Sequence, residues 1–313
     1  MRDKLLVFGS GFLVKHIAGQ FLSTGGDVCI LYNEHTVPGI DKGKQVKRKE
    51  GNTLDILSTY QPGYLLFATG DSFVSDNIDI GKSITKNVMD TLGTLEIIFQ
   101  NHSSFNFIKK ILVIGSAAEY GREYQNAIAE STPTHPTSIY GLTKIFLYDT
   151  SMYYAWKGLP VVHVRQFNAI GPFQRDVFVL SSFCKQIAMI EKGLKEPQMT
   201  VGNLLAERDF IDVRDAANAY CLLFDAGVPG HVYNLASGIS FAIEDLLDIL
   251  LELTTYKEKS IRIERTVDSA ARKNMLASRL LADTTKLKEL GFKPQYTLRQ
   301  TVGDTLNFWR QNV

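Results

Sequence analysis

Short apolar runs alternate with amphipathic stretches through the first two thirds of the chain. The apolar runs have the length of buried strands, and they lie at residues 4–8, 28–31, 64–68, 111–114 and 161–164. Between them, residues 12–22 and 84–100 carry apolar positions at helical spacing. Alternation of this kind is typical of βαβ units, so it predicts an α/β fold with a parallel sheet covered by helices on both faces.

The pattern changes after Pro172. Residues 180–192 and 243–254 have helical spacing, whereas residues 209–213 and 231–235 have the apolar character of strands that return to the sheet. From Lys257 onward the chain is polar and broken. A second, smaller unit is therefore expected in the last third.

Length and charge narrow the class of protein. The chain has 313 residues, which suffices for one large domain or two closely packed ones. Its formal net charge of +1 gives no bulk field that attracts nucleic acid or an anionic membrane, so neither is expected as a partner. The basic run at residues 42–49 fits a solvated loop, with a role near a cofactor phosphate as the alternative.

The N-terminal apolar run, residues 5–14, resembles the core of a signal peptide. Lys15 and His16 interrupt it at once, and no small-residue cleavage site follows. No stretch is long enough to span a bilayer, so we expect a cytoplasmic protein. The cysteines lie far apart and make no metal-ligand pattern; buried free thiols without a metal are therefore expected at Cys29, Cys184 and Cys221.

A glycine-rich turn follows the first predicted strand and opens the first predicted helix. Gly9 and Gly11 let backbone amides approach a pyrophosphate, whose charge is favoured at a helix N-terminus. Phe12 and Leu13 are expected to join them in binding a nicotinamide dinucleotide. Val14 stands at the third glycine position of the usual motif, which predicts looser packing of helix against strand. Taken alone, such glycines fit an ordinary turn equally well.

The end of the second predicted strand bears on the choice of cofactor. A site that prefers NAD usually has Asp or Glu there to bind the ribose diol. Here the strand ends at Tyr32 and Asn33, with Glu34 one residue later. No arginine stands ready for a 2′-phosphate in this segment. The expectation is NAD(P) with a slight tilt to NADP, because no carboxylate at the tip repels the phosphate.

Tyr140 and Lys144 form a Tyr-x-x-x-Lys pattern, which on a helix places both side chains on one face. A phenol ordinarily has a pKa near ~10, and a nearby ammonium favours the phenolate. Lys144 is therefore expected to lower the pKa of Tyr140. Ser116 ends a different predicted strand, where its hydroxyl can hydrogen-bond a reacting oxygen. These three residues are the predicted catalytic group.

With these residues the chain resembles the extended short-chain dehydrogenases/reductases, in the nucleotide-sugar epimerase/dehydratase group. The resemblance covers nearly the whole chain. Its motifs are Asn87 with Gly93-Thr94, Ser116 four residues before Tyr120, Glu130, Pro133, Pro136 and Ser138 before Tyr140, Arg165, Asn168, Gly171 and Pro172, Gly202-Asn203, Arg208-Asp209-Phe210 with Asp212-Val213 and Asp215, and Asp283 with residues 290–294.

The resemblance implies a Rossmann-like doubly wound parallel sheet with a smaller α/β C-terminal substrate domain. Residues 1–171, with a returning segment at about 209–236, would bind NAD(P), and residues 172–208 and 237–313 would bind the nucleotide sugar. A homodimer through the helices around Tyr140 is also implied. The further cofactor-binding positions, beside Tyr140 and Lys144, would be Asn33, Asn52, Thr53, Ala68, Thr69, Gly70 and Asn87.

The resemblance also implies which residues contact a nucleotide-diphosphate sugar. Ser116, Asn168 and Arg208 match the family's positions, and a guanidinium suits bidentate phosphate binding. Arg272 is expected to be the arginine of an Arg-Pro-x-Glu/Asp-like element. That element is only partly kept, because residues 273–276 depart from it. How the ribose and diphosphate are held is therefore not encoded clearly.

Glu119-Tyr120-Gly121 and the segment 202–215 are most similar to GDP-4-keto-6-deoxy-mannose reductases. This similarity implies an oxidoreductase of deoxysugar biosynthesis that reduces a 4-keto-6-deoxy sugar on a nucleotide diphosphate. The alternatives are a nucleotide-sugar 4-epimerase with tightly bound NAD, and a non-catalytic NAD(P)-binding redox sensor. A 4,6-dehydratase is not expected, because Ala117 and Ala118 stand where dehydratases carry an acidic pair.

Overall fold

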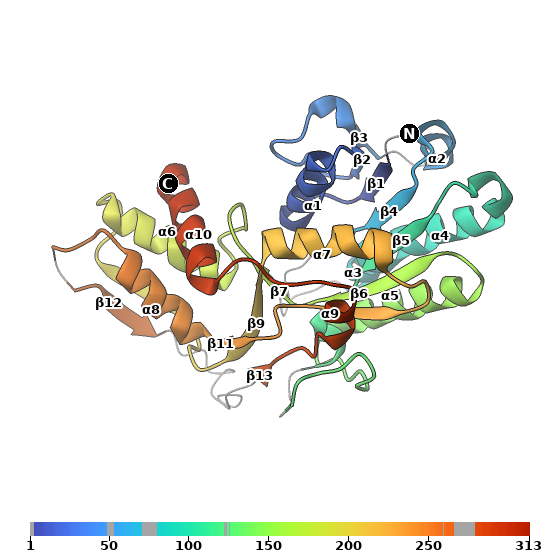
Figure 1. The fold of residues 1–313 in the computed structure, drawn as a ribbon. Coiled ribbons are helices and arrows are strands. Elements are labelled where there is room, and N and C mark those ends of the chain that lie inside the picture. The colour runs from blue at the N-terminus through green and yellow to red at the C-terminus, as the bar shows by residue number, and fades with distance from the viewer. Residues whose placement is uncertain are drawn as a thin grey trace.

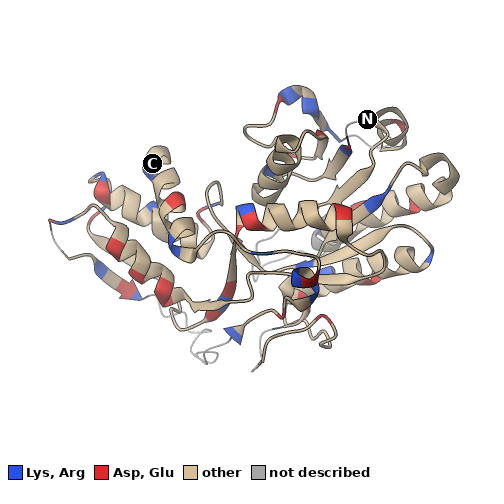
Figure 2. Cartoon of the chain, in the orientation of Figure 1, with Lys and Arg blue, Asp and Glu red and all other residues tan. Residues whose placement is uncertain are grey.

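The computed structural model describes residues 3–48, 53–70, 80–121, 124, 126–258, 260–265 and 279–313. A large central sheet with its helices forms one end of the molecule, and smaller sheets with three long helices form the other (Figure 1). In the described part of the chain, no helix is long and apolar enough to cross a membrane. Basic residues gather near β3 and acidic ones along α8, and elsewhere the two signs are interspersed (Figure 2).

The central sheet has seven strands in the order β10-β6-β5-β4-β1-β2-β3, and all neighbours are parallel. The first strand is followed directly by the glycine turn, and the sequence order reverses between β1 and β4. That point is where α/β sheets bind their ligands. The strands are β1 (Lys4–Phe8), β2 (Asp27–Tyr32), β3 (Gln45–Lys47), β4 (Tyr64–Phe67), β5 (Lys110–Ile114), β6 (Val161–Gln166) and β10 (Val232–Leu235).

Helices cover both faces of this sheet, as predicted. Leu5 and Val7 of β1 point to the core under α1 and α7, whereas Leu6 and Phe8 point to the core under α2, α4 and α5. Successive side chains of a strand point to opposite faces of the sheet. Because both faces are covered here, both sets of side chains are apolar and the runs are continuous in the sequence. The helices are α1 (Phe12–Ser23), α2 (Thr53–Tyr60), α4 (Asp90–Gln100), α5 (Ile139–Trp156) and α7 (Val213–Ala226).

Short elements connect these units. A π-helical turn, Thr85–Met89 (η2), joins α3 to α4, so the predicted helix at 84–100 starts earlier and is interrupted. The remaining short elements of this part are α3 (Ile80–Ile84) and the 3-10 turns η1 (Lys42–Lys44), η3 (His102–Phe105) and η4 (Ala117–Glu119).

The C-terminal part is built round a separate apolar core. Helix α6 packs against α10 and α8, with Phe183, Ile187, Leu246, Val302 and Leu306 in the contact. Its elements are β7 (Asn168–Ile170), α6 (Val179–Glu191), β8 (Gln198–Val201), β9 (Glu207–Asp212), β11 (Ser240–Ala242), α8 (Ile243–Leu253), β12 (Arg262–Arg265), β13 (Arg279–Leu280), α9 (Thr285–Glu289) and α10 (Leu298–Asn312).

Three expectations about elements need correction. The strand at 209–213 does not return to the central sheet, because β9 pairs with β7, β11 and β13; only the run at 231–235 returns, as β10. The polar C-terminal stretch contains the helix α10. Few of its residues are apolar, so the sequence pattern did not indicate a helix, but Val302 and Leu306 pack in the same core as α6. The basic run at 42–49 contributes the edge strand β3 as well as a turn. The division into two binding domains stays a prediction.

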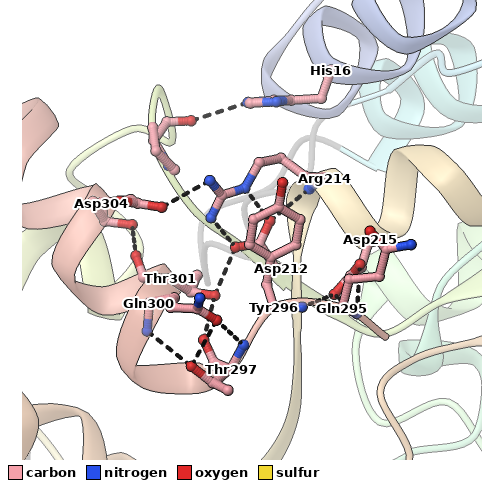
Figure 3. Close-up of polar contacts among 12 residues, drawn as sticks. His16, Asp212, Arg214, Asp215, Gln295, Tyr296, Thr297, Gln300, Thr301 and Asp304 are labelled. Carbon is pink, nitrogen blue, oxygen red and sulfur yellow. Dashed lines mark hydrogen bonds and ion pairs between the residues drawn. The ribbon is translucent and has the colours of Figure 1, made fainter. Parts of the chain in front are cut away.

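A polar cluster joins the two ends of the molecule, and we call Asp212, Arg214, Tyr296, Thr301 and Asp304 the junction cluster (Figure 3). Arg214 Nη2 lies 2.7 Å from Asp212 Oδ2, and its Nη1 lies 2.8 Å from Asp304 Oδ2 on α10. Thr301 donates to Asp212 at 2.7 Å, and the guanidinium stacks 3.7 Å from the Tyr296 ring centroid. The start of α7 is thereby tied to α10.

Candidate active site

The predicted catalytic residues come together at the carboxyl end of β5. Ser116 is the N-cap of η4, and its hydroxyl accepts a hydrogen bond from the backbone N–H of Ala118. Tyr140 lies in the first turn of α5, and Lys144 one turn later. A Cβ on Gly141 would lie 2.5 Å from the Ala118 carbonyl oxygen, so this first turn packs directly on the loop that carries Ser116.

Tyr140 is half-buried. Burial raises the pKa of Tyr140 to about 12, which outweighs the lowering by the nearby Ser116 hydroxyl. The pKa of Tyr140 is therefore not lowered overall, as was expected from Lys144: the Lys144 ammonium donates to the Ile114 carbonyl oxygen at 3.0 Å and lies 5.7 Å from the Tyr140 ring centroid. At neutral pH Tyr140 keeps its proton.

Lys144 is a buried ammonium, only 4% exposed. Burial lowers the pKa of Lys144 to about 8, and the charge of the Glu119 carboxylate acts in the opposite direction. The side chain is therefore mostly protonated at neutral pH, although its proton comes off far more easily than that of a surface lysine.

The glycine turn has the conformation that a dinucleotide needs. Gly9 and Gly11 have φ values of +114° and +146°, and a Cβ on Gly9 would lie 2.4 Å from the Ala68 carbonyl oxygen. A Cβ on Gly11, the N-cap of α1, would meet only open space within 4 Å. No side chain caps α1, so its first backbone N–H groups could receive an anion such as a pyrophosphate. Val14 is buried between α1 and the sheet.

Phe12 and Leu13, the other predicted residues of this turn, start α1; Phe12 packs against the His16 ring and Leu13 against the core. The structure thus brings Gly9, Gly11 and the start of α1 together at one end of the sheet.

The loop after β4 forms the next wall of this region. Gly70 has a φ of +108°, and a Cβ there would lie 1.8 Å from Asn87 Oδ1, so Asn87 of the π-helical turn lies against it. Thr69 contacts Thr91 at 3.1 Å, and the Ala68 N–H donates to Phe8. Single π-helical turns within α-helices, such as η2, are frequently found at functional sites. Thr53 is buried at the start of α2, and Asn52 lies outside the described residues.

An arginine does lie at the tip of β2, contrary to the prediction from the sequence. The Arg48 N–H donates to the Tyr32 carbonyl oxygen at 2.8 Å because β3 pairs with β2. Its guanidinium lies 3.1 Å from Asp90, which also accepts from Asn33 at 3.4 Å. Sequence reasoning missed this residue because the neighbour relation arises from strand pairing; the basic run at 42–49 was the available signal.

The predicted substrate residues Asn168 and Arg208 lie on the paired strands β7 and β9. Asn168 Nδ2 donates to the Asp209 carbonyl oxygen at 3.4 Å, and Arg208 Nη1 donates to the Glu207 carbonyl oxygen at 2.7 Å. Both side chains are half-buried. Arg272 lies outside the described residues. The two described residues are therefore brought onto one small sheet.

Asp209 organises this small sheet. Its buried carboxylate accepts hydrogen bonds from the N–H groups of Ser237, Gly238 and Ala282 at 2.9 to 3.2 Å. Burial raises the pKa of Asp209 to about 6, although these donors act in the opposite direction. The carboxylate thus joins two segments, at residues 237–238 and at Ala282, to the strand that carries Arg208.

A family model described as GDP-mannose 4,6 dehydratase matches residues 9–305 of the chain. A GDP-6-deoxy-D-mannose reductase of Pseudomonas aeruginosa is 29% identical over 321 aligned positions, which cover 100% of this chain and 99% of the relative. A UDP-glucose 4-epimerase of Corynebacterium glutamicum is 26% identical, covering 97% of this chain and 95% of the relative.

Among solved structures, RMD from Pseudomonas aeruginosa complexed with NADPH has a TM-score of 0.79 and 26% identity, covering 99% of this chain and 100% of that one. The predicted resemblance and the predicted Rossmann-like fold are therefore confirmed over the full length of the chain.

Proposed function

The chain belongs to the family of GDP-mannose 4,6-dehydratase, and we propose that it acts there as an NAD(P)H-dependent reductase of a nucleotide-diphosphate 4-keto-6-deoxy sugar. GDP-4-keto-6-deoxy-mannose is the proposed type of substrate, in line with the similarity to the reductase of Pseudomonas aeruginosa. One observation carries the proposal: the first turn of α5, which holds Tyr140, packs on the loop that holds Ser116, and the buried Lys144 ammonium lies 5.7 Å from the Tyr140 ring centroid.

NAD(P)H, when bound, supplies the hydride for the carbonyl carbon. Tyr140 holds the proton that the carbonyl oxygen receives, since a pKa of about 12 keeps the phenol protonated at neutral pH. Ser116 hydrogen-bonds the same oxygen and polarises the carbonyl. Lys144 places a positive charge near the phenol, which stabilises the phenolate that forms as the proton leaves, and it holds the nicotinamide ribose.

Dehydration is not proposed, despite the name of the family. Loss of water across a sugar ring needs an acid for the leaving hydroxyl and a base for the adjacent carbon. Ala117 and Ala118 follow Ser116 directly and neither can move a proton. Reduction needs one proton besides the hydride, and Tyr140 provides it.

The role of the smaller part of the chain and the location of the protein are proposals as well. We infer that residues 172–208 and 237–313 bind the nucleotide sugar, with Asn168 and Arg208 at their border with the central sheet. A cytoplasmic location is in line with the free thiols of Cys29, Cys184 and Cys221.

The function is tested by mixing purified protein with NADPH and GDP-4-keto-6-deoxy-mannose. Loss of the absorbance of the reduced nicotinamide, with an equal amount of a 4-hydroxy product identified by NMR, is expected. Interconversion of 4-epimers of UDP-sugars without cofactor consumption would move the assignment to a 4-epimerase. Cofactor binding with no turnover of any nucleotide sugar would leave the redox sensor. Formation of a 4-keto-6-deoxy sugar from GDP-mannose would contradict the argument from Ala117 and Ala118.

We propose NADP as the preferred cofactor form. The tip of β2 carries Asn33 in place of a carboxylate, and the Arg48 guanidinium pairs with Asp90, the same side chain that Asn33 contacts. A guanidinium suits a 2′-phosphate. Calorimetry with NAD, NADH, NADP and NADPH measures the preference. Tighter binding of the non-phosphorylated pair would reverse it, and binding of none would end the dinucleotide assignment.

We also propose a homodimer formed through α5. This helix exposes a line of apolar side chains at helical spacing, with Trp156 78% exposed; the others are Leu142, Phe146 and Tyr153. Exposed apolar patches of this kind are typical of interfaces. Light scattering is expected to give twice the mass of the chain, and a Phe146→Glu variant the mass of a monomer. A native monomer would contradict the proposal.

A further inference from the structure

Glu119 is a buried carboxylate next to the loop that carries Ser116. It is the last residue of η4 and is 0% exposed. Its Oε1 accepts a hydrogen bond from the Ser116 backbone N–H at 2.9 Å. Burying a carboxylate is unfavourable unless it is paired, so the groups around it define what it does.

Two side chains of β6 hold this carboxylate from the other side. His163 Nε2 lies 3.0 Å from Glu119 Oε1, and Arg165 Nε donates to Oε2 at 2.7 Å. Arg165 Nη1 also donates to the Tyr120 hydroxyl at 2.8 Å, and His163 Nδ1 lies 3.3 Å from Ser151 on α5. We call Ser116, Glu119, His163 and Arg165 the catalytic cluster. His163 is 0% exposed, so its contact with the Glu119 carboxylate lies inside the protein.

The chain directly after β5 has no free space beside the contact between Glu119 and His163. A Cβ on Gly115 would lie 2.2 Å from His163 Nε2 and 2.3 Å from Glu119 Oε1. The Gly115 N–H in turn donates to the Val164 carbonyl oxygen at 2.8 Å. Glycine at this position leaves the space in which the imidazole pairs with the carboxylate that accepts from the Ser116 N–H.

Glu119 also acts across to α5. Its negative charge raises the pKa of Lys144, which burial lowers, and it raises the pKa of Tyr140. The titratable and charged groups that face it are His163 and Arg165 of β6, Tyr120 beside η4, and Tyr140, Lys144 and Tyr148 of α5.

We propose that Glu119 is a positioning residue for the reduction, which holds the backbone of Ser116 in place against β6. Its part in turnover rests on the proposed function, whereas its effect on Lys144 concerns the binding of the cofactor. The proposal follows from the direct hydrogen bond to Ser116 and from the burial of Glu119 together with His163 and Arg165, which pair with it.

The test uses Glu119→Gln, which removes the charge at nearly the same volume. Binding of NADPH, followed by nicotinamide fluorescence, is measured against pH without any sugar. In the native protein the affinity is expected to fall as the pH rises through about 8, where Lys144 loses its proton. In Glu119→Gln the midpoint is expected to move down by on the order of one pH unit, because a stabilising negative charge is gone. Lys144→Met is expected to show no such step.

A remote carboxylate of similar kind provides the control. Glu191 lies 2.7 Å from Arg310 and its side chain is 7% exposed, but it belongs to the C-terminal core. Glu191→Gln is expected to lower stability and leave the midpoint at its native pH. A folded Glu119→Gln protein with the native midpoint and native kcat would overturn the proposal.

Glu119→Asp separates position from charge and serves if the glutamine variant does not fold. It keeps the charge but withdraws the carboxylate from Ser116, so a lower kcat with a nearly native midpoint is expected. Native kcat in this variant would overturn the positioning of Ser116. Because the midpoint is read without sugar, a native protein that fails to reduce the keto sugar would refute the proposed function alone.

Discussion

The catalytic cluster and the junction cluster are built from the same parts. In each, a buried carboxylate accepts a hydrogen bond from a nearby backbone N–H and pairs with an arginine at 2.7 Å: Glu119 with Arg165, and Asp212 with Arg214. They differ in what surrounds the arginine. The Arg165 side chain is 3% exposed, whereas that of Arg214 is 29% exposed and also reaches Asp304 on another helix.

This difference suggests different tasks. Glu119 acts on the backbone of Ser116, which we propose hydrogen-bonds the substrate carbonyl, so a change there is expected to alter turnover. Asp212 and Arg214 join α7 to α10, so a change there is expected to alter stability (Figure 3). The expected effect of losing an ion pair therefore depends on the backbone group and on the element that the pair connects. The distance between the two charges alone does not tell whether turnover or stability would change.

Tyr140→Phe gives the largest expected effect on the catalytic side. Removal of the phenolic proton donor should lower kcat by about 100-fold or more, because no other group at this position can protonate the oxygen. Cofactor affinity, measured by calorimetry, should stay close to native since the ring remains. Near-native turnover on the keto sugar would show that Tyr140 is not the acid.

Arg214→Met tests the junction side. The variant loses the ion pairs to Asp212 and Asp304 and leaves a buried carboxylate with fewer donors. We expect the free energy of unfolding, measured with urea, to fall by about 2 kcal/mol, with kcat close to native. Arg299→Met, which removes an exposed pair on the same helix α10, should change stability little. If Arg214→Met lost activity without losing stability, the two clusters would not differ in the way described.

Arg208→Ala gives the smallest expected effect. It tests a residue outside both clusters, whose proposed role is to bind the sugar nucleotide. A contact to the diphosphate that is equal in ground and transition states raises KM and leaves kcat nearly unchanged. We expect KM for the sugar nucleotide to rise by roughly tenfold, the loss of one charged hydrogen bond. Arg262→Ala, an exposed arginine on β12, is the matched control. A collapse of kcat at native KM would instead place Arg208 in the chemistry.

The central sheet was predictable because its signal is local. A run such as residues 5–8 is apolar on both faces, which is typical of a strand covered on both sides. The run at 209–213 has Phe210 and Ile211 between two aspartates and also forms a strand. That strand lies in a different sheet, because the partner of a strand is chosen by residues far away in the chain.

The same reason explains the site residues that were missed. Arg48 reaches the tip of β2 through strand pairing, and Glu119 is buried only because His163 and Arg165 are supplied by β6. A glutamate is ordinarily exposed, so nothing in its own neighbourhood in the sequence indicated burial. Tyr140 and Lys144 were found because a helix fixes their spacing, but the pKa of Tyr140 depends on its burial and could not be derived from spacing.

Ala117 limits how this protein could be re-engineered or diverge. Its side chain is buried in an apolar cluster with Tyr120, Ile128 and Phe167, whereas Ala118 is half-buried beside it. A carboxylate introduced at residue 117 would enter that cluster without a partner and would be driven to its neutral form. Grafting an acidic pair to obtain an eliminating enzyme would thus require the loop and its supporting cluster to be exchanged together, so the two chemistries are separated by several coordinated substitutions.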